Sequence, residues 1–461
     1  MSEETNQFNN RIASFYQGPS QGECEAPCVD VTARFIRQTI SSNVMEKSSN
    51  GNKLSSPETP SLSKIHNTGR PVRIGIDARI FLVESSMERG LGHYTFHHLL
   101  TLSELCPDWQ FLLFVDFLAD SKEFKQLLKQ PNIEVAFFEN IDKYHLSIFH
   151  IPDCMSMIGG YDCPFKLAPT ATPVSILAHD LIPLRMSEGC YDQWATITQQ
   201  GYMRRLRLMK EREDVVVLAN SEYTRNDLMQ IGKIDSSRIS VVWAGLNQLP
   251  NEHHSSPEVI RATLEKYKIK LPFILHVGGL DPHKNFFNTF SAYMSLQSKV
   301  PSALVVVGSD VDPYKTHFKD IVQFNKAENV VFTGFVARSE LNALYASAAG
   351  LAFPSQLEGF GFPALEAVAH GCPVIGTRTG ALAEIIGDAG FLVDPLNYKQ
   401  IASAMESLLT QPDLRAELSK KGYERAKSFS WQRTAQLTKD AWQELWEKKA
   451  VAQPDYRCVA T

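Results

Sequence analysis

The chain has 461 residues, of which 44% are apolar and 21% charged, and its formal net charge is −5 at pH 7. A chain of this length predicts two to three domains, and the apolar fraction is enough to fill sizeable cores. The acidic balance argues against general nucleic-acid binding, which usually needs a basic footprint. We therefore expect small or neutral partners and no nucleic acid.

The cysteines and the N-terminal residues indicate in which cellular compartment the protein is expected. Eight cysteines are scattered without a repeated C-x-x-C pair or a nearby pair of histidines, as is typical of free thiols in a reducing compartment. The first residues are acidic and polar, without the apolar core of a signal peptide, and no stretch approaches eighteen apolar residues. We expect a cytoplasmic protein, at most peripherally attached to the inner face of a membrane.

Residues 1–70 differ in composition from the rest. A short helix is expected near residues 29–40, and the stretch that follows is rich in Ser, Asn and Pro and poor in core-forming residues. This composition predicts a mobile tail or linker.

The first ordered series begins with a β-branched run at residues 72–77. A glycine-rich loop, Gly90-Leu-Gly-His-Tyr94, and a helix from Phe96 to Leu105 are expected next. Further buried strands are predicted at residues 111–115, 133–137, 146–150, 174–177, 215–219 and 239–242. Helical patterns separate most of these strands, and this alternation predicts a parallel sheet covered on both faces.

A second series of the same kind starts at residues 273–278. Its other strands are predicted at residues 304–307, 330–332, 351–353, 374–375 and 391–393. The fold class is therefore α/β, with two doubly wound, Rossmann-like domains at 71–248 and 249–430, joined by a polar, proline-bounded linker near residues 247–256. Ligands of such sheets bind beyond the carboxyl ends of the strands, so we expect one central cleft.

The most informative motif lies between Glu358 and Glu366. Gly359 and Gly361 allow a close approach of the backbone to a ligand, and the helix that starts at Pro363 directs free N–H groups and a positive dipole end at whatever lies above the turn. A diphosphate fits such a turn. We expect Glu358 in the loop and Glu366 in the first helical turn, both facing the cleft, although acidic residues at a helix start also simply complement its dipole.

Six motifs occur in one order between residues 72 and 448: the Gly90-Leu-Gly92 loop, His179-Asp-Leu-Ile-Pro183, the segments 219–225 and 276–285, Phe332-Thr-Gly-Phe335, and the Glu358 to Glu366 element. This four fifths of the chain resembles the family-4 retaining glycosyltransferases of the GT-B fold, also called group 1 glycosyltransferases. The resemblance implies that the last helix, residues 431–448, crosses back onto the first domain and couples the two halves during closure.

The resemblance also assigns roles to residues. It implies that Glu366 holds the ribose of a donor nucleotide and that Glu358 contacts the sugar ring. Backbone N–H groups around Phe360, Gly361 and Phe362 would bind phosphate and sugar hydroxyls, and the backbone at Gly92 would face the donor phosphate. Carboxylates do accept hydrogen bonds from vicinal hydroxyls, and helix starts bind anions.

Lys284 follows a strand end and a proline, in a loop whose Gly279 belongs to the expected donor site. Its ammonium group would neutralise the charge that grows on the departing diphosphate. Many relatives add an arginine near this lysine, whereas the corresponding positions here are Gly279 and His283, so this departure puts the second cation in doubt. Arg225 would supply part of it, or would be a solvated residue at a helix start.

His179 follows the strand at 174–177 and precedes Asp180, which either orients the imidazole or caps the next turn. A lone histidine at a strand end is often structural. The resemblance implies contact with the donor sugar at its 6-hydroxyl and support of an oxocarbenium-like transition state. The leaving diphosphate would take the acceptor proton on the same face.

The sequence bears on two classes of cofactor, dinucleotides and metal ions. Dinucleotide binding fails because the sixth position of a G-x-G-x-x-G motif counted from Gly90 is Thr95. Asp310-Val-Asp312 has the spacing of a D-x-D metal site, but its place after a strand predicts a strand end and a helix cap. We expect metal-independent catalysis and no cofactor.

Two segments concern the acceptor, which is expected to be a saccharide or a lipid-linked sugar. Residues 202–212 are basic and amphipathic, and form either a contact with anionic lipid or a solvated helix face. His150 and the residues up to Cys154 follow a strand end on the acceptor side.

Three functions compete. The leading one is retaining hexosyl transfer, with GDP-mannose as the first donor and a UDP-hexose as the alternative. The second is another enzyme of this fold, such as an epimerase or a phosphorylase, although no pyridoxal-binding lysine site is evident. The third is a catalytically silent sugar-binding or scaffold protein, against which His179, Lys284, Glu358 and Glu366 argue.

Overall fold

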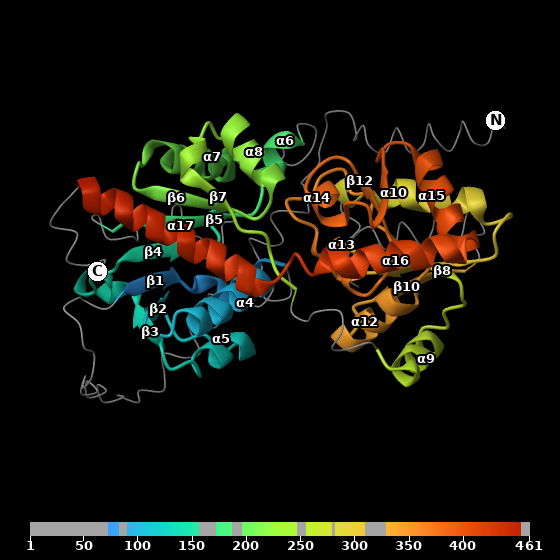
Figure 1. Ribbon diagram of the computed structural model, residues 1–461, viewed down its shortest axis with the longest axis horizontal. Helices are drawn as coiled ribbons and strands as arrows, with labels where there is room; N and C mark the ends of the chain where they lie inside the picture. The colour runs from blue at the N-terminus through green and yellow to red at the C-terminus, as the bar shows by residue number, and fades with distance from the viewer. Residues whose placement is uncertain are drawn as a thin grey trace. The chain divides into compact units, whose positions relative to one another are not determined.

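The computed structural model describes residues 72–82, 90–155, 172–186, 196–246, 255–278, 282–308 and 329–452. These residues form two parallel sheets with helices packed on them (Figure 1). The tail 1–70, most of the expected linker, Gly279 and the Asp310-Val-Asp312 motif lie outside the described residues.

The first sheet has seven strands in the order β3-β2-β1-β4-β5-β6-β7, all parallel. Its strands are β1 (Arg73–Asp77), β2 (Gln110–Val115), β3 (Ile133–Phe137), β4 (Ile148–Ile151), β5 (Val174–Ala178), β6 (Val215–Ala219) and β7 (Ile239–Val241). The helices of this half are α4 (Gly90–Leu105), α5 (Lys122–Leu127), α6 (Ile182–Arg185), α7 (Thr196–Glu211) and α8 (Glu222–Gln230), with short 3-10 turns at η1 (Arg79–Leu82), η2 (Phe138–Lys143) and η5 (Ser236–Arg238).

The second sheet has six parallel strands in the order β10-β9-β8-β11-β12-β13. Its strands are β8 (Phe273–Val277), β9 (Ala303–Val307), β10 (Val330–Gly334), β11 (Gly350–Ala352), β12 (Val374–Thr377) and β13 (Gly390–Val393). Around them lie α9 (Pro257–Lys266), η6 (Pro282–Lys284), α10 (Phe286–Leu296), α12 (Arg338–Ser347), α13 (Phe362–Ala369), α14 (Leu382–Ile386), α15 (Tyr398–Thr410) and α16 (Pro412–Ala426).

The strands form where apolar, β-branched residues run without alternation. All five residues of β6 and of β9 are buried, because helices cover both faces of each sheet. The predicted α/β class and the two parallel sheets are confirmed, and the predicted strands fall within two residues of the observed ones.

Both sheets reverse their strand order beside the first strand. In the first sheet β1 lies between β2 and β4, and in the second β8 lies between β9 and β11. Such a switch point opens a crevice at the carboxyl ends of the two central strands, because the connections leave in opposite directions. In the second half, the loops after β8 and β11 carry Lys284 and Glu358.

The last helix, α17 (Trp431–Ala452), belongs to the core of the first half and lies along α4 (Figure 1). Trp442 is fully buried and its indole Nε1 donates to Ser175 Oγ at 2.7 Å. Trp446 Nε1 donates to the Ser147 carbonyl at 3.1 Å. Two indoles therefore complete the core of the first sheet from the far end of the sequence.

One local expectation was wrong. The segment from Gly90 to Tyr94 is not a loop, since α4 already begins at Gly90. The first amides of a helix have no partner within it, so a low intrinsic helix propensity matters less there. A side chain at Gly90 would also meet a neighbour, because its Cβ would lie 3.1 Å from Phe362 Cδ2.

Within the described residues, no helix combines the length and the apolar character needed to cross a membrane.

Candidate active site

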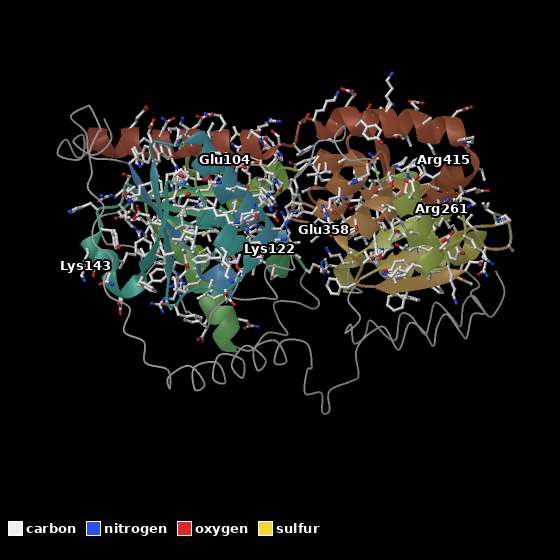
Figure 2. The ribbon with its side chains drawn as sticks, turned by 90° about the horizontal axis from the view of Figure 1, so that it is seen from below. Glu104, Lys122, Lys143, Arg261, Glu358 and Arg415 are labelled. Carbon is white, nitrogen blue, oxygen red and sulfur yellow. The ribbon has the colours of Figure 1, made fainter. Side chains whose placement is uncertain are left out.

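Lys284 and Glu358 meet at the switch point of the second sheet. Lys284 Nζ lies 2.7 Å from Glu358 Oε1, and both side chains are largely buried. The ammonium group also lies 5.3 Å from the centre of the Phe353 ring. Figure 2 shows Glu358 on the opposite side of the second half from Arg261 and Arg415. A largely buried cation beside a carboxylate can bind both an anionic phosphate and the hydroxyls of a sugar.

Asn285 fixes the loop that carries Lys284. Its backbone is left-handed, with φ of 58°, and its buried side-chain amide donates to the carbonyls of Pro354 at 2.9 Å and Pro395 at 2.7 Å. The Gln356 amide donates to the His283 carbonyl at 2.8 Å. The loops after β8 and β11 are thus tied to each other on both sides of the Lys284–Glu358 pair.

Helix α13 begins just after this pair. Its N-cap is Gly361, whose φ of 105° disfavours a side chain, and Pro363 occupies its first turn. A Cβ on Gly361 would lie 2.6 Å from Leu382 Cδ2, so the glycine makes room for the protein itself rather than for a ligand. Because the helix starts at Phe362, Glu366 is its fifth residue and lies in the second turn, not in the first as expected.

None of the described hydrogen bonds joins Glu366 to Lys284 or to Glu358. Its Oε1 accepts from Arg338 Nη1 at 2.7 Å, and its Oε2 accepts from the hydroxyl of Tyr345 at 3.2 Å. Tyr345 is buried and stacks on His370, whereas half of the Arg338 side chain is exposed. The carboxylate is therefore held on one side by a fixed phenol and on the other by a side chain that is free to leave.

His179 comes from the first half, directly after β5. Its Nε2 lies 3.0 Å from the carbonyl of Pro152, which can only accept, so the proton is on Nε2, and no described hydrogen bond uses the lone pair of Nδ1. Burial lowers the pKa of His179 to about 4, so the imidazole is neutral at pH 7. The ring meets Tyr94 edge-on at 5.5 Å.

Asp180 caps the turn that follows. Its Oδ1 accepts from the Ile182 amide at 3.0 Å, and no described hydrogen bond joins it to the imidazole, so the capping alternative is the one observed. Burial raises the pKa of the Asp180 carboxyl group, and Glu358 raises it further, while His179 and Lys284 act in the opposite sense. These four side chains therefore share one electrostatic environment.

The loop with Glu358 packs directly against the loop with His179. A Cβ on Gly359 would lie 2.3 Å from the His179 carbonyl oxygen and 2.6 Å from Asp180 Cβ. The Gly359 carbonyl accepts from Ser221 Oγ at 2.7 Å. Any side chain at position 359 would separate the two loops, which explains the glycine there without a ligand.

Gly92 and the residues around Phe360 belong to the same neighbourhood. Gly92 is buried in the first turn of α4, and Phe360 is buried and packs against Phe362 with ring centres 5.2 Å apart. His93 meets the Phe362 ring edge-on at 6.1 Å. The starts of α4 and α13 thus lie close together, and each has the partial positive charge of a helix N-terminus.

Arg225, the candidate for a second cation beside Lys284, forms its ion pair within its own helix instead. Its Nη1 pairs with Glu222 Oε2 on the same helix at 3.2 Å, and about a third of the side chain is exposed. The alternative of a helix-start residue fits this geometry.

Sequence reasoning missed several residues of this site. Arg338 and Tyr345 flank Glu366, and Glu384 binds the start of α8 from the other half. The motif at 219–225 contains a helix N-cap, Ser221, which is a readable signal. Nothing in the local sequence indicated that Glu384 would be the partner of that helix.

Comparison with known proteins finds a family match for part of the chain. Residues 260–425 match the family model described as "Glycosyl transferases group 1". This stretch spans β8 to α16 and contains Lys284, Glu358 and Glu366.

Curated relatives are similar to about half of the chain. The chain is 28% identical over 277 residues to the serotype-specific mannosyltransferase WbdA of Escherichia coli, covering 58% of this chain and 33% of that protein. It is 27% identical over 240 residues to the O-antigen chain mannosyltransferase B of Escherichia coli, covering 50% and 61%. The chain thus spans a third to about three fifths of the length of these relatives.

Solved structures match over both sheets. The crystal structure of Anabaena HepE in complex with UDP and glucose superimposes with a TM-score of 0.62 at 18% identity, covering 81% of this chain and all of that one. At 18% identity, this structural similarity shows the fold alone. Residues 260–425 of this chain are thus similar to the group 1 glycosyltransferases, and its two Rossmann-like sheets have the GT-B fold.

Proposed function

We propose that the protein transfers a hexosyl group from a nucleotide sugar to a saccharide or glycolipid acceptor, with retention of configuration and without a metal ion. The observation that carries this proposal is the Lys284–Glu358 pair at the switch point, directly before the start of α13. A cation, a carboxylate and a helix start together match a sugar joined to a diphosphate.

The donor would bind as follows. Amides at the start of α13 and the ammonium group of Lys284 hold the diphosphate, and Glu358 accepts hydrogen bonds from sugar hydroxyls. Glu366 accepts from the ribose hydroxyls, which replace Arg338, because that side chain is half exposed and can turn away while Tyr345 stays. Lys284 then stabilises the charge that grows on the leaving diphosphate.

The acceptor hydroxyl would attack the anomeric carbon from the side on which the diphosphate leaves. The bond from carbon to the diphosphate oxygen breaks, the bond to the acceptor oxygen forms, and the acceptor proton passes to the leaving phosphate. His179, neutral at pH 7, uses the lone pair of Nδ1 to accept from a hydroxyl of the sugar and orient it. Its task is positioning rather than proton removal.

GDP-mannose is the leading donor, because the relatives named above are mannosyltransferases. A UDP-hexose is the alternative, since Anabaena HepE was solved with UDP and glucose. A silent nucleotide-sugar-binding protein would retain binding without turnover.

The experiment is a donor panel of GDP-mannose, UDP-glucose, UDP-galactose, UDP-N-acetylglucosamine and ADP-glucose. Thermal stabilisation and slow release of free nucleotide are measured for the wild type and for Glu366→Ala. One donor that stabilises the wild type, is hydrolysed slowly and no longer stabilises the variant supports the function and identifies the sugar. Stabilisation without any release, even with acceptor sugars present, favours the silent protein.

A peripheral membrane contact is part of the same proposal. Helix α7 exposes Met203, Arg204, Arg207 and Lys210, an arrangement that suits anionic lipid if the acceptor is lipid-linked. Co-sedimentation with vesicles containing phosphatidylglycerol, compared between the wild type and Arg204→Glu/Arg207→Glu, tests it. Equal sedimentation of both proteins would leave a solvated helix face.

A further inference from the structure

The first turn of α8 is a place where the two halves form hydrogen bonds with each other. The Glu222 amide donates to Glu384 Oε2 at 2.9 Å, and the Tyr223 amide donates to Glu384 Oε1 at 2.7 Å. Glu384 lies on α14, in the second half, so one carboxylate bridges the halves with both of its oxygens. Trp243 Nε1 also donates to Glu384 Oε2, at 3.2 Å.

This contact is electrostatically favourable. The first amides of a helix have no partner within it, and the N-terminus carries a partial positive charge. Hydrogen bonds from such amides to an ionised carboxylate are among the stronger ones in proteins. When the halves separate, these amides, the Trp243 indole and the carboxylate must all return to water, so the contact specifically favours the arrangement in which the halves touch.

Side chains of the same turn also bind the two loops that form the candidate active site. Ser221 Oγ donates to the Gly359 carbonyl at 2.7 Å, next to Glu358. The hydroxyl of Thr224 lies 3.2 Å from the His179 carbonyl and 3.3 Å from the Gly359 carbonyl, and its single proton can serve one of them. Residues 221–224 therefore lie between the loop of His179 and the loop of Glu358 and bind both.

Glu384 is connected to Glu358 from the other side as well. The Ala381 amide, three residues before Glu384, donates to the Glu358 carbonyl at 3.0 Å. The Glu384 amide in turn donates to the Ala381 carbonyl at 3.0 Å. A displacement of α14 relative to α8 would thus be passed to the backbone of Glu358.

We propose that Glu384 is a positioning residue for the transfer reaction. By binding the first turn of α8, it sets Glu358 of one half against His179 of the other, so that the sugar is held by both while the bond to the leaving diphosphate breaks. This proposal rests on the proposed function. It assigns Glu384 no contact with the donor, so donor affinity, which resides in the second half, should not depend on its charge.

The test compares Glu384→Gln and Glu384→Ala with Asp235→Ala. Asp235 is a matched control, since its carboxylate caps a turn within the first half by accepting from the Ser237 amide at 2.8 Å. Thermal stability is recorded for every variant, and three further quantities are measured: donor Kd, kcat and deuterium uptake of the peptide that contains Glu222 and Tyr223. Glu384→Gln is the second variant because it keeps the shape of the side chain if the alanine variant folds poorly.

We expect Glu384→Ala to lower kcat about 10- to 100-fold with donor Kd changed less than threefold, and to speed deuterium uptake at residues 222–223 in the donor complex. Glu384→Gln should fall between this variant and the wild type, and Asp235→Ala should match the wild type in all three. Unchanged kcat in Glu384→Ala, with or without faster exchange, overturns the positioning role. A parallel loss of donor affinity and of thermal stability overturns it too, because it indicates a purely structural residue.

The two proposals fail separately. A wild-type protein that transfers no sugar from any donor contradicts the transferase function. A wild type that transfers, together with a Glu384→Ala variant that transfers equally well, contradicts only the positioning role.

Discussion

Lys284 and Glu358 are 74 positions apart in sequence, yet Lys284 Nζ lies 2.7 Å from Glu358 Oε1 because β8 and β11 are neighbours in the second sheet. The two loops leave the carboxyl ends of adjacent parallel strands, which is the arrangement that creates a ligand site in a doubly wound sheet. The two groups form an ion pair in a largely buried place.

Lys284→Met should abolish most turnover. The variant removes the cation that stabilises the leaving diphosphate, and loss of one such group typically costs roughly 100- to 1,000-fold in kcat. Lys421→Met, which removes an exposed lysine paired with Glu417 on α16, is the control. Steady-state release of nucleotide measures both, and a loss below threefold in Lys284→Met would assign the lysine a structural role.

Glu366→Ala and His179→Ala should separate binding from turnover. Loss of Glu366 removes the acceptor for the ribose hydroxyls and should weaken nucleotide binding at least tenfold. Loss of His179 should leave donor Kd within about threefold and lower kcat. Calorimetric titration with donor, together with turnover, distinguishes them, and an equal loss of affinity in both variants would contradict this division of roles.

Gly359→Ala should impair the reaction more than it impairs folding. The new Cβ would lie 2.3 Å from the His179 carbonyl oxygen and would force apart the two loops that carry His179 and Glu358. Gly422→Ala is a control, since its Cβ would meet the Val368 carbonyl at 2.9 Å, a contact within the second half. We expect kcat per folded molecule to fall only in Gly359→Ala. A similar fall of kcat in both variants would mean that backbone strain elsewhere in the second half also lowers kcat, without a separation of the two loops.

Acid should destabilise the first half through its buried histidines. Burial lowers the pKa of His98 and of His97 to about 3 and that of His179 to about 4, whereas the unfolded chain titrates near 6.5. Since the unfolded state binds more protons between these values, the stabilising contribution is complete above pH 6.5 and is lost as pH falls toward 4. At pH 4.5 the loss is roughly 2 to 3 kcal/mol per histidine.

Urea unfolding at pH 7.0 and 4.5 measures this loss, and His98→Gln should reduce the difference between the two pH values. His98 Nε2 lies 2.8 Å from Thr438 Oγ1, a bond that glutamine can replace. An unchanged pH difference in the variant would show that carboxyl groups, not histidines, account for the acid sensitivity.

Turnover should be insensitive to EDTA. Lys284 and the starts of α13 and α4 would provide the positive charge that a metal ion supplies in other transferases. Nucleotide release in the presence of excess EDTA should equal release without it. A loss that Mg²⁺ or Mn²⁺ restores would contradict metal independence.

A feature of the fold or of the site could be predicted when its signal lay within a short stretch of sequence. The strands were readable because residues such as 215–219 and 303–307 are continuous apolar runs, and the proximity of Lys284 to Glu358 followed from parallel strands ending at one edge. The start of α4 was missed because two glycines within three residues are weak helix formers, and only the neighbouring Phe362 reveals why Gly90 is small.

Contacts between distant segments could not be predicted. Glu384 binds amides 162 and 161 positions away, and Arg338 pairs with Glu366 through side-chain rotamers that no sequence pattern specifies. Such partners are known only once the loops of both halves are placed in space.

The position of α17 has a consequence for the synthesis of the chain. The seven strands of the first sheet are complete at Val241, but Trp442 and Trp446, which fill its core, follow about 200 residues later. At roughly 5–20 residues per second, the ribosome needs on the order of 10 to 40 s to reach them. During that interval the nascent first half has all the strands of its sheet but lacks α17. The apolar surface that α17 later covers is therefore accessible to chaperones or to a neighbouring chain.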